Sequence, residues 1–458
     1  MSYYAYVCKI DNLRKHPNAD RLQLGECFGN TVCVDMSYAA GEVGIYFPTD
    51  GQLSVEFAEY NNLLRKKDDA GNSIGGYMDP NKRNVTSIRL RGEKSDGLFL
   101  HLDCISYTKA EVKEGDSFTM LNGHEICQKY IPHSHKQPYE NKVKGNRTRK
   151  RKVPIAPLFV EHADTEQLAY NLGAFHPGDY VEITLKMHGT SQRTGRVPMF
   201  VKYKRSFIDW LLRRPGTPVY DWGYVSGTRR TVLENFDGGY YGSNAFREQH
   251  SKFFEGKLHK GEEVYYEVVG FTDTGASIMG VVSNKKLNDK AFVKQYGEMT
   301  TFSYGCSPTG YMTYEDGSHD ALPQSDFYVY RMTMTNEDGD IVEYTPDYMR
   351  YRCAQMGCKC VPLLWSGIIP AHTGDEAAIS LGQDAGAWIK AKAEEFYDGP
   401  DPIGKTHVRE GVVCRIVNRP AFTAYKHKNF AFKCLEGICK AEETEPDMEE
   451  AEEVKDEA

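Results

Sequence analysis

The chain has 458 residues, of which 40% are hydrophobic and 26% charged, a composition typical of an ordinary globular protein with two or three domains. Its net charge of −8 argues at first against a polyanionic partner. However, residues 441–458 alone contain ten acidic residues and one lysine, so the rest of the chain carries a charge of +1. We expect this acidic tail to be disordered, because it cannot bury enough apolar surface to offset its chain entropy.

Residues 1–125 are expected to form a small all-β module. Six short runs rich in β-branched and aromatic residues predict strands, with Gly, Asn and Asp turns between several of them: YYAYVCKI, LQLGECF, TVCVDM, VGIYF, SIRLRG and GLFLHL. So many short strands favour a small barrel. Residues 16–27 and 89–100 resemble segments of the OB-like tRNA-binding modules. The resemblance implies an OB-fold domain that binds nucleic acid, and the alternative is a barrel that only packs against its neighbour.

Residues 126–153 are polar and rich in Lys and Arg, without an apolar period, and predict a basic linker. It either neutralises phosphates or is a solvated spacer. From residue 154 to 440 strands predominate over helices, with neither a βαβ rhythm nor a glycine-rich phosphate loop. This pattern predicts an α+β domain of mostly antiparallel sheet. The run FIDWLLRRPG predicts a short amphipathic helix within a basic insertion, and we expect a surface helix rather than an RNA contact.

The twelve cysteines follow no framework pattern. The nearest cluster is formed by Cys353, Cys358 and Cys360, which lacks the paired ligands of a zinc site. We therefore expect reduced thiols in a cytoplasmic protein. The N-terminus has no long apolar run or small-residue cleavage site, so we expect no signal peptide and no membrane span.

One lysine stands in an unusual setting. Lys186 ends the apolar run VEITL and leads directly into His188-Gly189-Thr190. A surface lysine does not require such a position, whereas a nucleophilic lysine does. The KxHG pattern is weak by itself, and the case for a catalytic lysine depends on the segments that follow it.

These later segments occur in a fixed order. YVSGTRRT puts Ser226 and Arg229 in a turn, and EVYYEVVGF puts Glu267 in a strand. In SDFYVYRMTM, strand alternation predicts that Phe327, Val329 and Arg331 face one way, and Tyr328 and Tyr330 the other. REGVVCRIV begins a strand at Glu410, and in AYKHKNFAF Lys426 and Lys428 share one side of a strand.

The ordered set resembles the covalent nucleotidyltransferases, namely DNA ligases, RNA ligases and mRNA capping enzymes. His188, DFYVYRM and AYKHKN resemble the nick-sealing RNA ligases in particular. A short stretch after Lys428 and a module in front of the catalytic domain resemble the branch of ATP-dependent RNA ligases with an N-terminal OB domain. Arg331 departs from the pattern, since many relatives carry Asp at this position.

The resemblance implies a role for each position. Lys186 would form a lysyl-AMP with ATP, Lys426 and Lys428 would supply positive charge, and Glu410 would bind Mg²⁺ or Mn²⁺. The remaining nucleotide-binding residues would be His188 and Gly189 near the nucleotide, Arg229 at the ribose or a phosphate end, Glu267 at the ribose and Tyr330 stacked on adenine.

The sequence therefore predicts a cytoplasmic, monomeric ATP-dependent RNA ligase that joins 3′-OH and 5′-phosphate ends in RNA repair or nick sealing. Two alternatives stay open: a DNA ligase or capping-type nucleotidyltransferase, and an RNA-binding protein with an inactive transferase scaffold. The acidic tail either solubilises the chain or competes with RNA for a basic groove.

Overall fold

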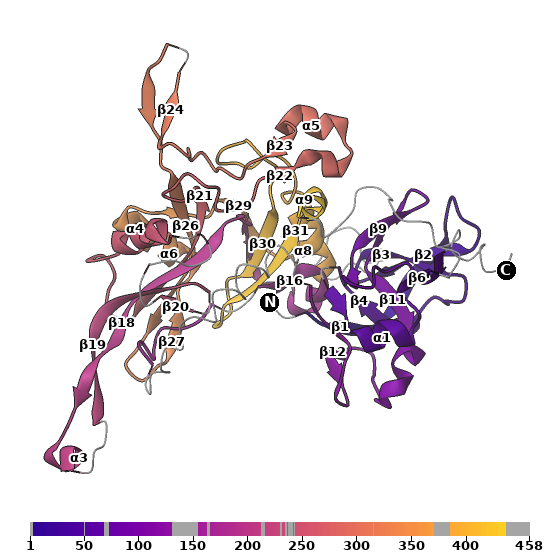
Figure 1. Ribbon diagram of the computed structural model, residues 1–458, viewed down its shortest axis with the longest axis horizontal. Coiled ribbons are helices and arrows are strands. Elements are labelled where there is room, and N and C mark those ends of the chain that lie inside the picture. Colours follow the sequence, from indigo (N-terminus) through magenta and orange to yellow (C-terminus); the bar gives the residue numbers. More distant parts are fainter. Residues whose placement is uncertain are drawn as a thin grey trace. The chain divides into compact units, whose positions relative to one another are not determined.

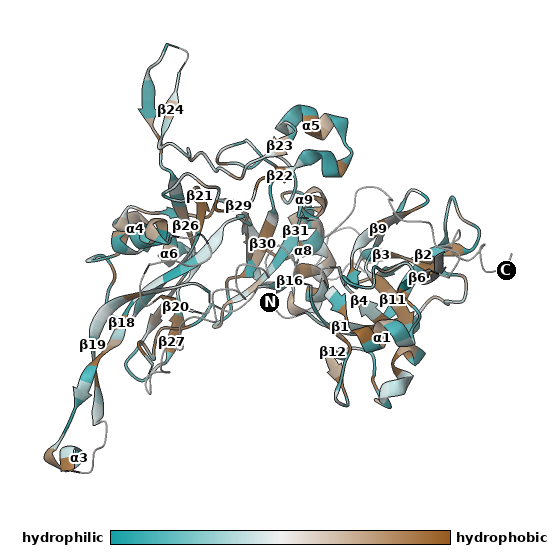
Figure 2. Cartoon of the chain, viewed as in Figure 1, coloured by the Kyte–Doolittle hydropathy of each residue, from teal (hydrophilic) through white to brown (hydrophobic). Residues whose placement is uncertain are grey.

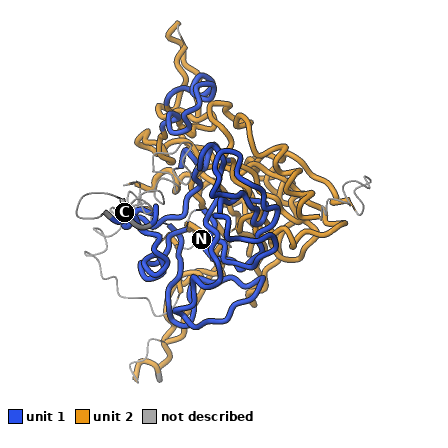
Figure 3. Tube along the Cα trace, turned by 90° about the vertical axis from the view of Figure 1, so that its right-hand side faces the viewer, with its two compact units in different colours: residues 1–136, 283–298, 430–458 blue, residues 137–282, 299–429 orange. Residues whose placement is uncertain are grey.

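The computed structural model shows two compact units (Figure 3). Unit 1 contains residues 1–136, 283–298 and 430–458, and unit 2 contains residues 137–282 and 299–429. The structure describes residues 3–49, 51–67, 73–130, 154–162, 165–211, 216–229, 231–233, 236, 241, 243–314, 316–370 and 385–436. The acidic tail and nearly all of the predicted basic linker lie outside these residues.

Each of the six runs predicted to be strands in unit 1 contains one. Its strands are β1 (Ala5–Lys15), β2 (Leu22–Cys27), β3 (Asn30–Asp35), β4 (Glu42–Phe47), β5 (Gly51–Leu53), β6 (Arg65–Lys67), β7 (Ser73–Gly75), β8 (Asn84–Val85), β9 (Ser87–Leu90), β10 (Glu93–Asp96), β11 (Leu98–His101), β12 (Ser117–Phe118), β13 (Met120–Leu121), β14 (His124–Glu125) and β15 (Cys127–Lys129). The main sheet has the order β11-β4-β1-β2-β3, with β12 on β1, and all of its pairs are antiparallel.

Unit 1 also includes helices from three parts of the chain. They are α1 (Val55–Tyr60), η1 (Leu102–Thr108), η4 (Asn284–Leu287), α5 (Lys290–Tyr296) and α9 (Phe430–Leu435). The ammonium group of Lys94 lies 4.1 Å from the ring centre of Phe430, and Lys286 Nζ donates to the carbonyl of Leu435 at 3.1 Å. Segments far apart in the chain therefore join the N-terminal strands in one compact unit, where the sequence predicted separate consecutive domains.

Unit 2 contains the segments with the predicted catalytic motifs. Its strands are β16 (Glu166–Gln167), β17 (Tyr180–Leu185), β18 (Thr190–Lys204), β19 (Thr217–Gly227), β20 (Val232–Leu233), β21 (Glu262–Gly270), β23 (Met299–Thr300), β24 (Tyr311–Thr313), β25 (His319–Ala321), β26 (Ser325–Thr335), β27 (Ile341–Glu343), β28 (Lys359–Cys360), β29 (Leu363–Ile368), β30 (Gly411–Ile416) and β31 (Thr423–Lys428), and β22 (Val282–Ser283) lies at the boundary. Its helices are η2 (Leu168–Tyr170), η3 (Leu172–Ala174), α3 (Phe207–Leu211), α4 (Ala245–Phe253), α6 (Pro346–Met356) and α8 (Ala385–Glu394).

Two sheets organise unit 2 (Figure 1). One has the order β16-β31-β30-β17-β29, and the other has the order β20-β19-β18-β21-β26-β27, with β28 on β26. Most pairs are antiparallel, and the exceptions are β16 with β31 and β26 with β28. The α+β class with mostly antiparallel sheets, predicted from the sequence, is confirmed. None of the helices in the described part of the chain is long and apolar enough to cross a membrane.

Apolar residues fill the outer faces of the two sheets. Val264, Tyr266 and Val268 of β21 pack in a core that includes Phe246 of α4 and Met349 of α6. The second sheet buries alternate residues of β17 and β30 in a core with residues of α8. Since side chains alternate along a strand, the polar residues between them point to the opposite faces. Those faces carry the predicted site.

The α6 helix is fixed at both ends and by a buried ion pair. Thr345 caps its N-terminus by accepting the Tyr348 N–H, and Gly357 ends it with φ +75°. Arg352 donates from Nε and Nη2 to the two carboxylate oxygens of Glu262, at 2.8 and 2.7 Å, and both residues are buried. This pair ties α6 to the start of β21.

Replacement of Arg352 by Met is expected to destabilise unit 2 by about 3–5 kcal/mol, because it leaves the Glu262 charge buried without its partner. The double variant Arg352→Met/Glu262→Gln is expected to recover part of this loss. Urea unfolding followed by tryptophan fluorescence measures both. A double variant no more stable than the single one would contradict this role for the pair.

Candidate active site

Strand register brings the three predicted lysines to one face. Leu185 pairs with Val412, and the backbone N–H of Lys186 donates to the Gly411 carbonyl at 2.9 Å. Gly411 in turn pairs with Lys428, and Val413 pairs with Lys426. Residues that lie opposite one another in paired strands share a face, so all three lysines project from the same side of this sheet. The prediction that Lys426 and Lys428 share a side is confirmed.

Glu410 lies at the centre of these cations. Its Oε1 is 2.5 Å from Lys186 Nζ and 3.1 Å from Lys428 Nζ, and its Oε2 is 3.7 Å from His188 Nδ1. Burial disfavours the charged carboxylate, but the positive charges of Lys186 and Lys428 outweigh burial and hold the pKa of Glu410 well below its ordinary value. Glu410 is therefore an anion that forms ion pairs with Lys186 and Lys428 through the same oxygen.

Lys426 is the most deeply buried of the three lysines. Burial, together with the positive charges of Lys186 and Lys428, lowers the pKa of Lys426 to about 8. Near neutral pH, it therefore remains a cation but gives up its proton more readily than a lysine in water.

Glycines allow two close approaches at the site. A Cβ on Gly189 would lie 2.4 Å from the Val268 carbonyl oxygen and 2.9 Å from Cγ of Glu267. Gly411 has φ +146°, and a Cβ there would lie 2.1 Å from the His427 carbonyl oxygen. Any larger residue would push β21 away from Gly189, or β31 away from Gly411. The need for glycine at position 189 thus has a direct steric cause, which is its contact with β21.

Glu267 enters from the other sheet. It pairs with Ser191 of β18 and Tyr328 of β26, in the middle of the sheet. Burial raises the pKa of Glu267 to about 7, in spite of the positive charges of Lys186 and Arg229. Lys186 belongs to the other sheet, so its action on Glu267 shows that the inner faces of the two sheets meet here, whereas Arg229 follows β19 of the same sheet as Glu267.

Arg247 of α4 is a buried residue of this region that the motif pattern does not identify. Its guanidinium donates to the Thr190 hydroxyl at 2.5 Å and to the Ser191 carbonyl at 3.2 Å, directly after Gly189. Its positive charge also acts to lower the pKa of Glu267. It comes from a helix more than fifty positions along the chain, and no local spacing connects it with Lys186.

The position of His188 depends on a second set of residues that sequence reasoning missed. The backbone N–H of His188 donates to the buried Tyr304 hydroxyl at 2.8 Å, and the Phe302 ring lies edge-on to the imidazole at 4.6 Å. Burial raises the pKa of Tyr304 well above its ordinary value, so this hydroxyl stays neutral. His407 packs against both aromatic rings. These contacts fix the backbone between Lys186 and Gly189.

Tyr330 lies at an irregularity of β26. Val329 pairs with Tyr266 and Arg331 pairs with Tyr265, so Tyr330 is an extra residue without a partner opposite it. The prediction that Arg331 faces the same way as Phe327 and Val329 is therefore wrong. Those two residues lie in the apolar core, whereas the bulge turns Arg331 to the inner face.

The Tyr330 ring is held by contacts with two neighbours. Its hydroxyl lies 3.0 Å from the Ser191 hydroxyl, and its ring centre lies 5.1 Å from that of His162. The ring is partly exposed. An ordered ring of this kind presents a flat surface for stacking.

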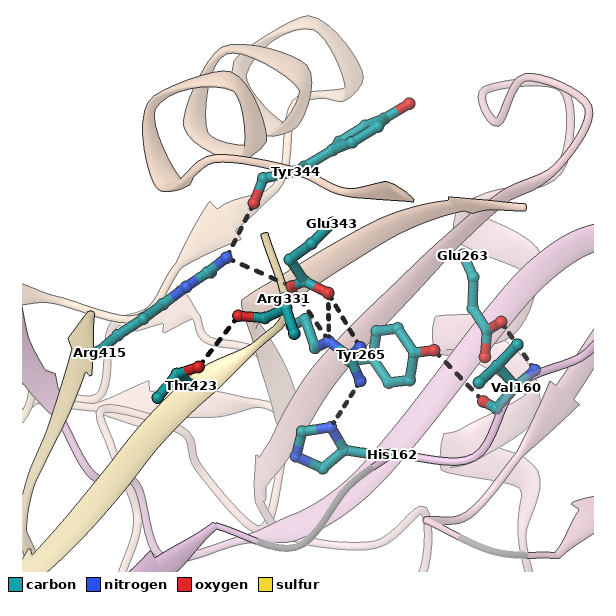
Figure 4. Close-up of polar contacts among 10 residues, drawn as sticks. Val160, His162, Glu263, Tyr265, Arg331, Glu343, Tyr344, Arg415 and Thr423 are labelled. Atoms are coloured by element: carbon teal, nitrogen blue, oxygen red, sulfur yellow. Dashed lines mark hydrogen bonds and ion pairs between the residues drawn. The ribbon is translucent and has the colours of Figure 1, made fainter. Parts of the chain in front are cut away.

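Arg331 stands at the centre of a buried network (Figure 4). Its Nε and Nη2 donate to the Glu343 carboxylate at 2.9–3.1 Å, and its Nη1 lies 3.3 Å from His162 Nδ1. Arg415 of the other sheet also donates to Glu343, at 3.3 Å, and to the Tyr344 carbonyl at 2.9 Å. The residue that departs from the family pattern therefore links the two sheets through Glu343 and supports His162 beside Tyr330.

Arg229 and Ser226, predicted together in a turn, separate in the structure. Ser226 is a buried residue of β19, where its hydroxyl lies 2.8 Å from the Thr194 hydroxyl, so the prediction for Ser226 is wrong. The cause is the length of β19, which extends to Gly227 and takes in the residue. Arg229 lies just beyond the strand, and its positive charge acts on Glu267 and Lys426.

The donor set suits a hard divalent cation. Oε2 of Glu410 is buried and has no hydrogen-bond partner among the described residues, while Oε1 is engaged by the lysines. Carboxylate oxygens are the ligands that Mg²⁺ and Mn²⁺ prefer. Glu410 is therefore able to offer one oxygen to a cation and retain the other for Lys186 and Lys428.

Comparisons with known proteins were made at three levels. No protein-family model matches the chain. No curated protein matches it either. Among solved structures, a lysine-to-alanine mutant of Naegleria gruberi RNA ligase with ATP and Mn is similar over 95% of this chain and 98% of that chain, at 17% identity and a TM-score of 0.56.

The same ligase with PPi is similar over 94% of this chain and 97% of that chain, at 16% identity and a TM-score of 0.55. The chain has the fold of an RNA ligase. At this identity the likeness concerns the fold, because a fold by itself does not determine chemistry. The residues gathered around Glu410 in this RNA ligase fold must carry any functional conclusion.

The low pKa of Lys426 predicts a pH dependence of stability. Its ordinary value is 10.5, so between about pH 8 and 10.5 the unfolded chain binds the proton that the folded chain has lost. Stability then rises with pH, because the cost of the buried charge disappears. The melting temperature of Lys426→Met relative to the parent should therefore be highest below pH 8 and fall as the pH approaches 10.5. A constant difference between pH 6.5 and 10.5 would contradict a depressed pKa.

Proposed function

We propose that the protein is an ATP-dependent RNA ligase that joins 3′-OH and 5′-phosphate RNA ends through lysyl-AMP and RNA-adenylate intermediates, in RNA repair or nick sealing. The observation that carries the proposal is the contact of Lys186 and Lys428 with one oxygen of Glu410, next to Glu267. Such a group of cations suits a phosphoryl group that transfers to Lys186. Naegleria gruberi RNA ligase, which shares this fold, has been solved with ATP and Mn and with AMP and Mn.

In the first step, Lys186 Nζ forms a bond to the α-phosphorus of ATP, the bond from that phosphorus to the leaving oxygen breaks, and pyrophosphate departs. The nitrogen lone pair must be free for attack, so Lys186 gives up a proton to solvent and its ion pair with Glu410 breaks. Glu410 would hold Mg²⁺ or Mn²⁺ through Oε2. When bound, the cation offsets the negative charge on the reacting phosphate.

In the later steps, AMP transfers to the 5′-phosphate of one RNA end, and the 3′-OH of the other end displaces it to form the phosphodiester. Lys426 and Lys428 supply positive charge to the phosphate in each transfer. Glu267 binds the ribose, Tyr330 stacks on adenine, Arg229 contacts the ribose or a phosphate end, and Gly189 lets the backbone approach the nucleotide beside His188. Arg331 and His162 position Tyr330.

The first test uses ATP labelled at the α-phosphate, with Mg²⁺ or Mn²⁺, and denaturing gels. The parent should acquire covalent label, and Lys186→Ala should acquire none. Lys428→Ala should lose about 10²-fold in labelling rate because it removes a cation at the phosphate. Glu410→Ala should lose about as much because it removes the carboxylate that would hold the divalent cation. Lys252→Ala, at an exposed lysine of α4, is the matched control and should match the parent.

Absence of label on the folded parent, with RNA binding retained, would instead favour an RNA-binding protein with an inactive scaffold. Label from GTP rather than ATP would favour a capping-type enzyme. Sealing of nicked DNA in preference to nicked RNA would favour a DNA ligase. Each alternative therefore has its own outcome in the same set of reactions.

We also propose that the N-terminal module is an OB fold that binds the RNA substrate. Since unit 1 includes residues 283–298 and 430–436, truncation would strip these segments of packing, and substitutions in the full chain are the cleaner test. Lys9, Arg14 and Lys15 of β1 are exposed cations. Their joint replacement by Gln should weaken nick sealing about tenfold at moderate salt and leave lysine adenylylation unchanged. Equal loss of both activities would mean that the module only supports folding.

A further inference from the structure

Strands β18 and β19 continue beyond the sheet that contains Glu267. Strand β18 pairs with β21 only as far as Gly195, whereas its pairing with β19 continues to the pair of Lys204 and Thr217. Residues 196–204 and 217–224 therefore form a two-stranded ribbon without a third strand, about 30 Å long at ~3.3 Å per residue. Figure 1 shows it leading to α3 at its end. The ribbon and α3 are called the arm below.

The register gives the ribbon two different faces. Phe200 pairs with Tyr220 and Tyr203 pairs with Pro218, and these pairs share a face because the pair between them points the other way. The ring centre of Phe200 lies 5.0 Å from that of Tyr203 and 6.1 Å from that of Tyr220. The opposite face carries Lys202 and Lys204, both exposed. One side of the ribbon is thus aromatic and the other cationic.

The base of the arm is anchored. Arg196 donates to the Leu258 carbonyl at 3.1 Å, and Lys260 Nζ lies 5.3 Å from the ring centre of Trp222. A two-stranded ribbon is only marginally stable by itself, and these contacts hold it at the sheet end. Halfway along the ribbon, the backbone N–H of Phe200 donates to the Ile155 carbonyl at 2.7 Å.

The tip exposes large aromatic side chains. Phe207 and Trp210 of α3 are 75% and 64% exposed, and their rings are stacked at 5.9 Å. Ser206 and Asp209 form a reciprocal cap at the start of α3, where each side chain accepts the backbone N–H of the other. The tip is therefore a formed structure that presents rings to solvent. Figure 2 shows hydrophobic residues within α3. Exposed rings of this kind indicate a binding surface.

The arm is also strongly basic. Residues 196–224 contain six Lys and Arg residues and two Asp residues, a charge of +4, although residues 1–440 as a whole carry only +1. Of the two acids, Asp209 is engaged in the cap. Arg213 and Arg214 contribute to this charge but lie outside the described residues. The arm is thus a second concentration of positive charge, besides that of residues 126–153, which contain nine Lys and Arg residues and one Glu.

We propose that the arm binds an unpaired stretch of RNA, with bases stacked on Phe207 and Trp210 and phosphates next to Lys202, Lys204 and Arg205. Aromatic rings stack on bases, and cations neutralise phosphates, in surfaces that bind single strands. A duplex offers no base face to an exposed ring, so the unpaired strand fits better than a paired one. This inference rests on the proposed function, since it assigns a further contact to the substrate of that reaction.

From the sequence alone, the run FIDWLLRRPG predicts an ordinary surface helix. The stacked and exposed rings, the two-faced ribbon and the charge of +4 favour a binding surface instead. The combination also separates RNA from an uncharged protein partner, for which the cationic face would have no complement. A membrane surface is the other class of partner and becomes an outcome of the test.

The test is fluorescence anisotropy with a labelled single-stranded RNA of ~16 nucleotides, its duplex form, and vesicles containing phosphatidylserine. The double variant Phe207→Ala/Trp210→Ala should bind the single strand about tenfold more weakly and the duplex with little change. The control is Tyr311→Ala/Met312→Ala on the β24–β25 hairpin, which removes two exposed apolar side chains, 44% and 43% exposed, from another projecting hairpin and should bind as the parent does.

The cations are tested through salt dependence. Lys202→Gln/Lys204→Gln should reduce the slope of log affinity against log salt by about 1.4, since each phosphate contact on a single strand contributes about 0.7. Lys202→Arg/Lys204→Arg should retain the slope of the parent. An unchanged slope in the Gln variant would overturn the cationic contact.

Lysine adenylylation is measured on every variant, because the arm lies outside the residues assigned to that step. Variants that adenylylate normally and bind single-stranded RNA as tightly as the parent would overturn the arm proposal and leave the proposed function intact. Loss of vesicle binding with unchanged RNA binding would replace RNA by a membrane surface. A parent that never adenylylates would instead refute the proposed function, whatever the arm binds.

Discussion

The candidate site depends on the ion pairs that the buried Glu410 carboxylate forms with Lys186 and Lys428. Three cationic side chains on one face of a sheet repel one another, and burial increases that repulsion because the effective dielectric constant falls. The Glu410 carboxylate lies between Lys186 and Lys428 and offsets this repulsion, and the two positive charges in turn keep the carboxylate ionised. The pKa of Lys426 is lowered first by its burial and then by the positive charges of Lys186 and Lys428, which Glu410 does not fully offset. The cluster is thus poised for an anionic ligand.

The sheets converge on this point through close backbone contacts rather than through long side chains. Gly189 lets the backbone after Lys186 approach the Val268 carbonyl, which places Glu267 next to the cluster. The bulge at Tyr330 then turns Arg331 inward, where it shares Glu343 with Arg415 of the opposite sheet. One inserted residue in the strand therefore turns Arg331 from the apolar-core side to the inner face, where it links two sheets and supports His162.

Charge is distributed unevenly along the chain, and the positive charge of the arm suits the RNA binding that we propose for it. The tail carries −9, residues 126–153 carry +8, the arm carries +4, and the remaining residues carry −11. A net charge of −8 therefore says little about affinity for a polyanion, because individual segments differ in sign. What matters is the local field of each surface, and the arm and the Glu410 cluster are both locally cationic in character.

The sequence by itself determined the strands, the α+β class and the candidate catalytic residues, because strand alternation and turn residues are local properties of the chain. Lys186 at a strand end and Lys426 and Lys428 on one side were both predictable for that reason. Only the tertiary structure revealed Arg247 and Tyr304 as supports of the site, the inward turn of Arg331, and the association of residues 283–298 and 430–436 with the N-terminal strands. Each of these depends on pairing between distant segments or on a one-residue change of register, and both are set by the packing of the whole unit rather than by neighbouring residues.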